Sequence, residues 1–384
     1  MDASRRKILK GLSASLLLSG FPSFAVVNAV TQSRNSHSAN KKVVWVCLRG
    51  ALDGLHTVIP HNEKQLGELR PTLFNDSLKG CFPLNSAFSL NGALPTLASW
   101  YQQKQLLPVI AVGSGYKGRS HFDGQDFLES GLPVIDAESG WLARAISGNS
   151  HNAVAISQRI PLSLRKTDKA SSWYPSRLEA ADNELISQLH RMYANDNALS
   201  MTLKNALSVK EMAGDIKVKG KHKFVELAKA AGTLLKEDNG LTVATLELGG
   251  WDTHNNQTPR LKRMLSQLDK GLLALKQSLD EEWENTLVVI ASEFGRTAKE
   301  NGTKGTDHGT GNVLLFAGGS LKGGHVLGEW PGLSANQLFE GRDLKPTSNI
   351  LSWIATGLSQ HWHLSNEQLK TVFPSAQIYS SRII

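Results

Sequence analysis

Three short polar segments lie between apolar strands in the second half of the chain. They read Gly249-Gly-Trp-Asp-Thr-His254, Ser292-Glu-Phe-Gly-Arg296 and Thr306-Asp-His-Gly309. Together they supply carboxylates and imidazoles, the donors from which proteins build divalent-metal sites. Each segment lies near the end of a hydrophobic strand, where open α/β folds place their chemistry. These residue types predict an enzyme with a metal ion, and the candidate ligands are Asp252, His254, Glu293, Asp307 and His308.

Two pairs of donors form the centre of this predicted site. Asp252 and His254 are separated by one residue, and in an extended chain such side chains point the same way and can converge on one ion. Asp307 and His308 are adjacent and would diverge in a strand. They lie, however, in the glycine-rich loop 302–311, which is flexible enough to bring both onto one ligand.

Two further carboxylates are candidate ligands, and each has a competing interpretation. Glu293 follows an expected buried strand, where a lone charge is costly and needs a partner. That partner is either a metal ion or Arg296 in a purely structural ion pair. Asp53 follows the first expected strand in a glycine-containing turn, so it is either a ligand or an ordinary turn residue.

The segment Arg119-Ser-His121 follows a second expected strand and a glycine-rich loop, and it leads into an expected helix over Gln125–Ser130. A hydroxyl at such a turn lies where backbone N–H groups and the helix dipole favour an anion. Ser120 is therefore a candidate nucleophile activated by metal, His121 a ligand or acid–base group, and Arg119 a clamp for an oxyanion. The alternative is an N-cap serine beside a hydrogen-bonded histidine.

Apolar runs of four to eight residues without alternation recur along the chain. Such runs are typical of strands buried on both faces, as in parallel sheets covered by helices. Helical patterns alternate with them, and the clearest follows Thr258-Pro259, an N-cap with proline at the first helical position. We therefore expect a three-layer α/β/α sandwich with a mostly parallel central sheet. The expected strands are Val43–Leu48, Leu106–Val112, Ala153–Ile156, Leu241–Leu248, Thr286–Ala291 and Val313–Ala317.

Residues 43–384 are predicted to form one domain with a helical insertion at about 171–238, a stretch without a strand candidate. The insertion is either a cap over the sheet or a set of ordinary packing helices. One of its helices is expected to begin near Arg177. Its apolar side is expected to be Leu178, Leu185, Ile186, Leu189 and Met192.

The chain of 384 residues is 40% hydrophobic, enough for a large core, and its formal net charge is +8. Residues 1–42 carry seven basic and one acidic side chain, so six of these charges lie there. No basic stripe with interleaved aromatics follows, which argues against nucleic acid as a partner. Cys47 and Cys81 are too few for a disulfide framework; a buried strand thiol at Cys47 and a single bridge between the two both remain open.

The first 25 residues have the form of an export signal. A basic segment, Ser4-Arg-Arg-Lys-Ile-Leu-Lys10, precedes a short apolar stretch and a small-x-small site at Ser23-Phe-Ala25. An uncleaved membrane anchor is the alternative, but the apolar stretch is short for a span, and we expect no stable span in the mature chain. Residues 26–42 are expected to be a disordered linker. The signal resembles the twin-arginine type, which implies the twin-arginine translocase as a partner and a periplasmic or otherwise exported protein.

The sequence also resembles the DUF1501 family of exported bacterial proteins, which is related to the alkaline phosphatase and sulfatase superfamily. Most of the mature chain takes part in the resemblance. The segments that carry it are Leu48-Arg-Gly-Ala-Leu-Asp-Gly-Leu55, Arg119-Ser-His-Phe-Asp123, Gly140-Trp-Leu-Ala-Arg144, Gly249-Gly-Trp-Asp-Thr-His-Asn-Asn-Gln257, Ser292-Glu-Phe-Gly-Arg-Thr297 and Asn301-Gly-Thr-Lys-Gly-Thr-Asp-His-Gly309.

The superfamily resemblance implies an alkaline phosphatase-like domain and assigns roles by order along the chain. Asp53 would be the first ligand, Ser120 the nucleophile, Asp252 with His254 the first pair, Glu293 part of the second pair, and His308 the late histidine. The sequence departs from that pattern because Glu293 is followed by phenylalanine and its pair lacks a histidine. A segment near the sulfatase signature, Cys81-Phe-Pro-Leu-Asn85, has asparagine in place of arginine, which argues against formylglycine chemistry.

Two functions remain open from the sequence. The first is an exported hydrolase of phosphate or sulfate esters that uses one or two divalent ions (zinc, calcium, magnesium or manganese) and acts on a small-molecule or polysaccharide ester. The second is a non-catalytic periplasmic binding or assembly protein on the same scaffold. The departures in the second ligand pair favour the binding protein, and the serine at the strand-to-helix turn favours the enzyme.

Overall fold

The computed structural model describes residues 41–175, 182–213, 223–237 and 240–384. The predicted signal peptide over 1–25 and the linker up to residue 40 lie outside the described residues. The linker was expected to reach residue 42, but Lys42 already belongs to the first strand, where its ammonium pairs with Glu282 at 3.1 Å. In the described part of the chain, no helix is both long and apolar enough to cross a bilayer.

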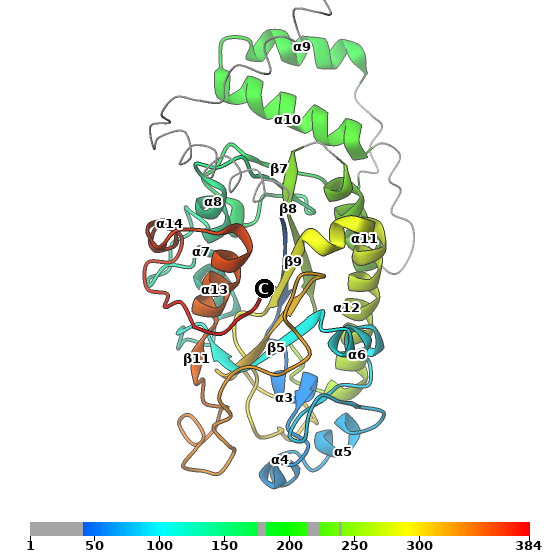
Figure 1. Cartoon of the computed structure of the whole chain (residues 1–384), viewed down its shortest axis with the longest axis vertical. Coiled ribbons are helices and arrows are strands. Elements are labelled where there is room, and N and C mark those ends of the chain that lie inside the picture. Colours follow the sequence, from blue (N-terminus) through cyan, green and yellow to red (C-terminus); the bar gives the residue numbers. More distant parts are fainter. Residues whose placement is uncertain (1–40, 176–181, 214–222, 238–239) are drawn as a thin grey trace, which may run out of the picture. The chain divides into compact units, whose positions relative to one another are not determined.

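An eight-stranded sheet in the order β11-β5-β10-β9-β1-β8-β6-β7 forms the centre of the domain (Figure 1). Neighbouring strands are parallel except at β10, which is antiparallel to both β9 and β5. The six strands expected from apolar runs are confirmed, each within one residue of its expected bounds. They are β1 (Lys42–Arg49), β5 (Leu106–Gly113), β6 (Asn152–Ala155), β8 (Leu241–Gly249), β9 (Thr286–Ala291) and β10 (Asn312–Ala317).

Within the described ranges, five shorter strands were not expected from the sequence. Two lie at the edges of the large sheet: β11 (Ser348–Asn349) and β7 (Ala170–Ser172), which enters the stretch predicted to contain no strand. The others, β2 (Val58–Ile59), β3 (Phe82–Pro83) and β4 (Ser89–Leu90), form a small separate sheet.

Helices cover both faces of the large sheet, so the predicted three-layer sandwich is confirmed (Figure 1). Side chains alternate along β1: Val44, Val46 and Leu48 join one core, while Val43, Trp45 and Cys47 join the other. The first core includes α6 (Pro95–Gln102), α11 (Lys223–Lys236) and α12 (Gln257–Leu279). The second includes α7 (His121–Ser130), α8 (Trp141–Ile146), α13 (Ile350–Trp362) and α14 (Asn366–Val372). The remaining short helices are α3 (Gly54–Thr57), α4 (Lys64–Leu69), α5 (Leu73–Ser77), η1 (Leu162–Leu164) and η2 (Asp280–Asn285).

Helix α12 buries the apolar face that its sequence pattern predicts, but it begins earlier than expected. Its N-cap is Asn256, with a φ of 43°, and not Thr258. The reason lies in a distant loop, because the N–H groups of Asn256 and Gln257 donate to the carbonyls of Thr303 and Lys304. The incoming loop therefore sets the first turn of the helix.

The predicted helical insertion divides into two parts. Helix α11 packs against α12 and β8 as an ordinary helix of the sandwich. Helices α9 (Asn183–Tyr193) and α10 (Asn197–Ala213) lie beyond the edge strand β7 (Figure 1). Helix α9 starts after the N-cap Asp182, and the expected start near Arg177, with Leu178, lies outside the described residues. None of its side chains is buried: of the expected apolar face, Leu185 and Met192 are exposed, and Ile186 and Leu189 are only partly buried.

Candidate metal centre

The topology brings four chain segments to one edge of the sheet. Strands β1, β5, β8 and β9 all run in the same direction, so the loops that follow them start at the same edge. Strand β10 runs the other way, so the loop that precedes it, with residues 302–311, reaches this edge as well. The three polar segments and the start of α7 are therefore neighbours in space, as predicted.

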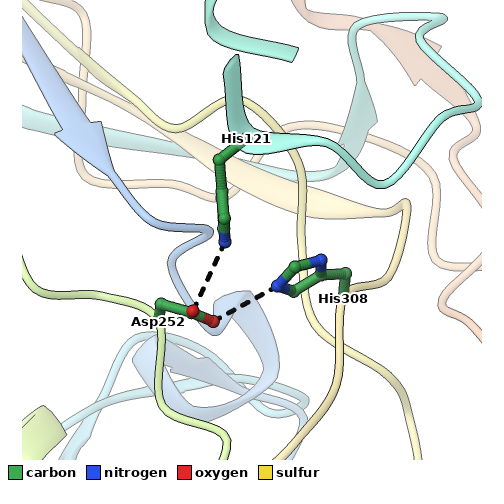
Figure 2. A group of neighbouring side chains, drawn as sticks. All are labelled: His121, Asp252 and His308. Carbon is green, nitrogen blue, oxygen red and sulfur yellow. Dashed lines mark hydrogen bonds and ion pairs between the residues drawn. The ribbon is translucent and has the colours of Figure 1, made fainter. Parts of the chain in front are cut away.

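Three side chains from three of these segments converge on one point (Figure 2). Ligand atoms of His121, Asp252 and His308 all lie within 4.8 Å of one another. The two oxygens of Asp252 are 3.5 Å from Nε2 of His121 and 3.3 Å from Nε2 of His308. His254 adjoins this group, with its Nε2 3.0 Å from Asp252 Oδ1 and 2.9 Å from Nε2 of His308. We call these four side chains the inner group.

In each histidine of the inner group, Nδ1 lies within hydrogen-bond distance of an acceptor oxygen. His254 Nδ1 is 2.9 Å from Asp307 Oδ1, and His121 Nδ1 is 2.8 Å from Glu293 Oε1. The third, His308 Nδ1, is 2.8 Å from the carbonyl oxygen of Arg119. Because an ionised carboxylate and a carbonyl only accept hydrogen bonds, each Nδ1 must carry the proton. In the neutral form of each ring, Nε2 then presents a lone pair toward Asp252, the arrangement that orients metal-binding histidines in proteins.

Neighbouring charges keep the carboxylates of the site ionised. Burial raises the pKa of Asp252, but the hydrogen bond and charge of Arg296 outweigh it, so the pKa lies below its ordinary value. Burial also raises the pKa of Glu293, and its bonds to His121 and Ser292 reverse the shift. The pKa of His308 is lowered, chiefly by burial, which favours the neutral imidazole that binds metal.

The donor set fits a divalent cation on two observations. Nε2 of His121 is buried and has no hydrogen-bond partner in the described part of the chain. Nε2 of His254 and Nε2 of His308 lie 2.9 Å apart, and with both rings neutral and protonated at Nδ1 their lone pairs repel each other unless a cation lies between them. Three imidazole nitrogens and a carboxylate form a ligand set that zinc and related ions accept.

Arg296 takes a different partner from the one considered in the sequence. The ion pair between Arg296 and Glu293 that competed with metal ligation is not formed. Arg296 Nη1 donates to Asp252 Oδ1 at 2.7 Å, and the rest of its guanidinium bonds to Thr306. Glu293 instead accepts the N–H groups of Gly50 and Ala51, so it links the loop after β1 to His121.

Three of the six predicted ligands lie outside the inner group. Glu293 and Asp307 each accept a hydrogen bond from Nδ1 of a histidine, as described above. Asp53 is 1% exposed, and its carboxylate caps α3 and forms an ion pair at 2.8 Å with Arg70. Gln257 also donates to it. Arg70, on a later segment with no recognisable motif, matches the charge of Asp53, and Asp53 as a direct ligand stays a prediction.

The three candidate catalytic residues, Arg119, Ser120 and His121, make different kinds of contact. His121 belongs to the inner group. Ser120 is the N-cap of α7 and its hydroxyl accepts the N–H of Asp123 at 3.3 Å, which is the alternative interpretation left open by the sequence. Arg119 holds His308 through its carbonyl, while its guanidinium is 3.3 Å from Glu340 and 3.7 Å from Asp343.

Aromatic side chains pack beside the inner group, and the two cysteines do not form a disulfide. Phe294 stacks on His121 with 5.1 Å between ring centroids, and Trp251 is fully buried. Cys47 and Cys81 are free thiols, and Cys47 is buried in β1 as its apolar context suggested.

Comparison with solved structures found distant similarities to proteins of several kinds. The C-terminal periplasmic domain of EcEptC from Escherichia coli, in complex with zinc, is 10% identical over 90% of this chain and 93% of that one, with a TM-score of 0.42. The phosphonate monoester hydrolase of Agrobacterium radiobacter is 10% identical over 89% of this chain and 79% of that one, at 0.43. The alkaline phosphatase of the Antarctic bacterium TAB5 is 12% identical over 88% and 99%, at 0.38.

Among curated proteins, none matches the sequence significantly. The profile of the DUF1501 family, described as proteins of unknown function, matches residues 133–373, more than half of the chain. The matched stretch contains three of the four inner donors, Asp252, His254 and His308. This chain belongs to the DUF1501 family.

Proposed function

We propose that this protein is an exported metal-dependent hydrolase of phosphate or sulfate esters. A divalent ion would be held by His121, Asp252 and His308, with His254 beside them. The observation that carries the proposal is the convergence of three imidazole Nε2 atoms on one carboxylate while each Nδ1 is already bonded.

Each residue around the inner group has a definite task in this proposal. Glu293 and Asp307 fix the rings of His121 and His254, and Arg296 keeps Asp252 ionised at neutral pH. A bound divalent ion would supply Lewis acidity toward an ester oxygen. A rigid donor set of this kind needs little rearrangement when an anionic ester arrives.

The start of α7 would receive the ester. Ser120 directly precedes His121, and the ten-residue helix α7 presents its N-terminus there, a position that favours anions. In this proposal Ser120 supplies the attacking hydroxyl. Arg119, whose guanidinium is 43% exposed, pairs with the ester's charged group in exchange for Glu340.

Export is the part of the proposal that rests on sequence alone. The basic segment Ser4–Lys10 and the apolar stretch after it favour passage through the twin-arginine translocase. The ester would then be a small molecule or polysaccharide outside the cytoplasm.

The test combines elemental analysis with turnover. Protein purified without chelators is analysed for metal and assayed against phosphate monoesters, phosphate diesters and sulfate esters. We expect stoichiometric metal and turnover of one ester class. Asp252→Ala and His308→Ala should lose both, while the matched control His190→Ala, an exposed histidine of α9, should keep both. Metal-free protein that cannot be reloaded would refute the proposal.

A metal-binding protein without turnover is the second candidate, and two contacts favour it. The hydroxyl of Ser120 is engaged in capping α7, and the charge of Asp53 is matched by Arg70. This candidate predicts the same metal content, no turnover across the ester panel, and a protein partner recovered with the metal-loaded chain but not with the Asp252→Ala variant.

A further inference from the structure

The site contains a fully buried arginine. The side chain of Arg296 is 0% exposed, while Asp252, its ion-pair partner, has a side chain that is 42% exposed. A buried guanidinium is costly unless its charge and its N–H groups are well matched. Among the described residues, Asp252 is the acidic side chain that pairs with this guanidinium, so the buried arginine is coupled directly to the inner group.

A network of buried polar groups fixes the position of this arginine. Its Nε donates to Thr306 Oγ1 at 3.1 Å, and its Nη2 donates to the carbonyl of the same residue. The Thr306 hydroxyl in turn donates to Gln257 Oε1 at 2.6 Å, and the hydroxyl of Thr253 donates to the same oxygen at 2.9 Å. Arg296 therefore cannot swing away from Asp252 without breaking this network.

The contact between Arg296 and Asp252 engages one of the two carboxylate oxygens of Asp252. Arg296 Nη1 occupies Asp252 Oδ1 at 2.7 Å, and Asp252 provides the inner group's one carboxylate. Asp252 Oδ2 is the carboxylate oxygen free of this bond, and the other donors of the inner group are imidazole nitrogens. Calcium and magnesium take mainly oxygen ligands, several of them carboxylates, whereas zinc and its neighbours in the transition series bind imidazole well.

We propose that Arg296 makes this site selective for ions that imidazole binds, zinc above all, and excludes calcium and magnesium. This inference rests on the proposed metal site, because it assigns the class of ion and a selectivity residue. Arg296 touches Asp252 and not the ester, so it is a positioning residue. It acts by competing for the oxygen on which a hard cation depends most.

The experiment measures binding and needs no substrate. The full chain is stripped with a chelator and titrated calorimetrically with zinc chloride, magnesium chloride and calcium chloride. For the wild type we expect saturable one-to-one zinc binding, and calcium and magnesium binding weaker by at least about a hundredfold. This comparison uses no variant and so does not depend on how a substitution folds.

The role of Arg296 itself is tested with three variants. Arg296→Gln frees Asp252 Oδ1, and the affinity for calcium and magnesium should rise about tenfold relative to zinc, the order expected when a competing charge-assisted hydrogen bond is removed. Arg296→Lys keeps the charge and should keep the selectivity. Arg260→Gln, a change at a partly exposed arginine of α12 that bonds Asn255, should change nothing. Circular dichroism establishes that each titrated variant is folded.

The outcomes separate this inference from the proposed function. Equal affinity of the wild type for zinc and calcium would overturn the selectivity and leave a metal-dependent hydrolase standing. Zinc selectivity that is unchanged in folded Arg296→Gln would remove Arg296 as its cause. Selective zinc binding without turnover of any ester would remove the hydrolase and support the inference. No binding of any ion would overturn both.

Discussion

Replacing Asp307 by asparagine tests how far the residues behind the histidines set metal affinity. Asp307 Oδ1 accepts the Nδ1 proton of His254 at 2.9 Å, and its side chain is 49% exposed. The other bond to its carboxylate comes from Asn301 at 3.2 Å. The substitution removes a charge and preserves the shape, so the fold should tolerate it.

The expected magnitude follows from the geometry. The amide oxygen of asparagine can still accept the Nδ1 proton of His254, but the bond is no longer assisted by a charge, so it fixes the ring less firmly and Nε2 becomes a weaker donor. Changes of this kind lower metal affinity roughly 10- to 100-fold, which equals about 1.4 to 2.7 kcal/mol of binding free energy. Complete loss of binding is not expected, because His121 and His308 keep their own acceptors.

The assay is competition for zinc against a chromophoric chelator at neutral pH, with the wild type and two variants side by side. Asp307→Asn should release zinc at a correspondingly lower chelator concentration. Asp123→Asn is the matched control, since Asp123 is a nearby exposed carboxylate whose hydrogen bonds include none to a histidine among the described residues. If Asp307→Asn binds zinc within twofold of the wild type, the reasoning from the histidine partners is refuted.

Three further predictions concern stability. Arg70→Met leaves the buried carboxylate of Asp53 without its cation and should lower the free energy of unfolding by about 3 to 5 kcal/mol in urea titrations; an unchanged midpoint would contradict the buried pair. Gly295→Ala would place a Cβ 1.8 Å from a backbone oxygen and should abolish soluble, metal-competent protein, whereas Gly302→Ala, with open space around it, should behave as wild type. Burial lowers the pKa of His361 to about 3, below the unfolded value near 6.5. The stability that the neutral buried His361 contributes is therefore complete above pH 6.5 and is lost as the pH falls toward 3. Urea midpoints that do not fall between pH 7 and pH 5 would contradict this.

Most of the sheet could be predicted because its strands are buried on both faces. Runs such as Thr286–Ala291 carry no alternation and stand out in the sequence. The short strands β7 and β11 have no such pattern, since two or three residues at a sheet edge are set by their neighbours. The start of α12 was misplaced for a related reason, because the carbonyls of Thr303 and Lys304 hold its first turn.

The sequence predicts which residues gather at the site better than it predicts how their side chains are arranged there. Parallel strands bring their following loops to one edge, so the gathering of Asp252, His254 and His308 follows from their places after or before strands. Which donors face inward depends on partners contributed by distant segments. Asp53 forms an ion pair with Arg70, and no spacing or motif in the sequence connects the two.

The central claim is that His121, Asp252 and His308 bind one metal ion, and anomalous diffraction from crystals grown with zinc tests it most directly. We predict one strong anomalous peak at the inner group, about 2.0 to 2.2 Å from Nε2 of both histidines and from a carboxylate oxygen of Asp252. The claim would be contradicted by a fully ordered site with no peak, or by zinc bound only elsewhere in the protein.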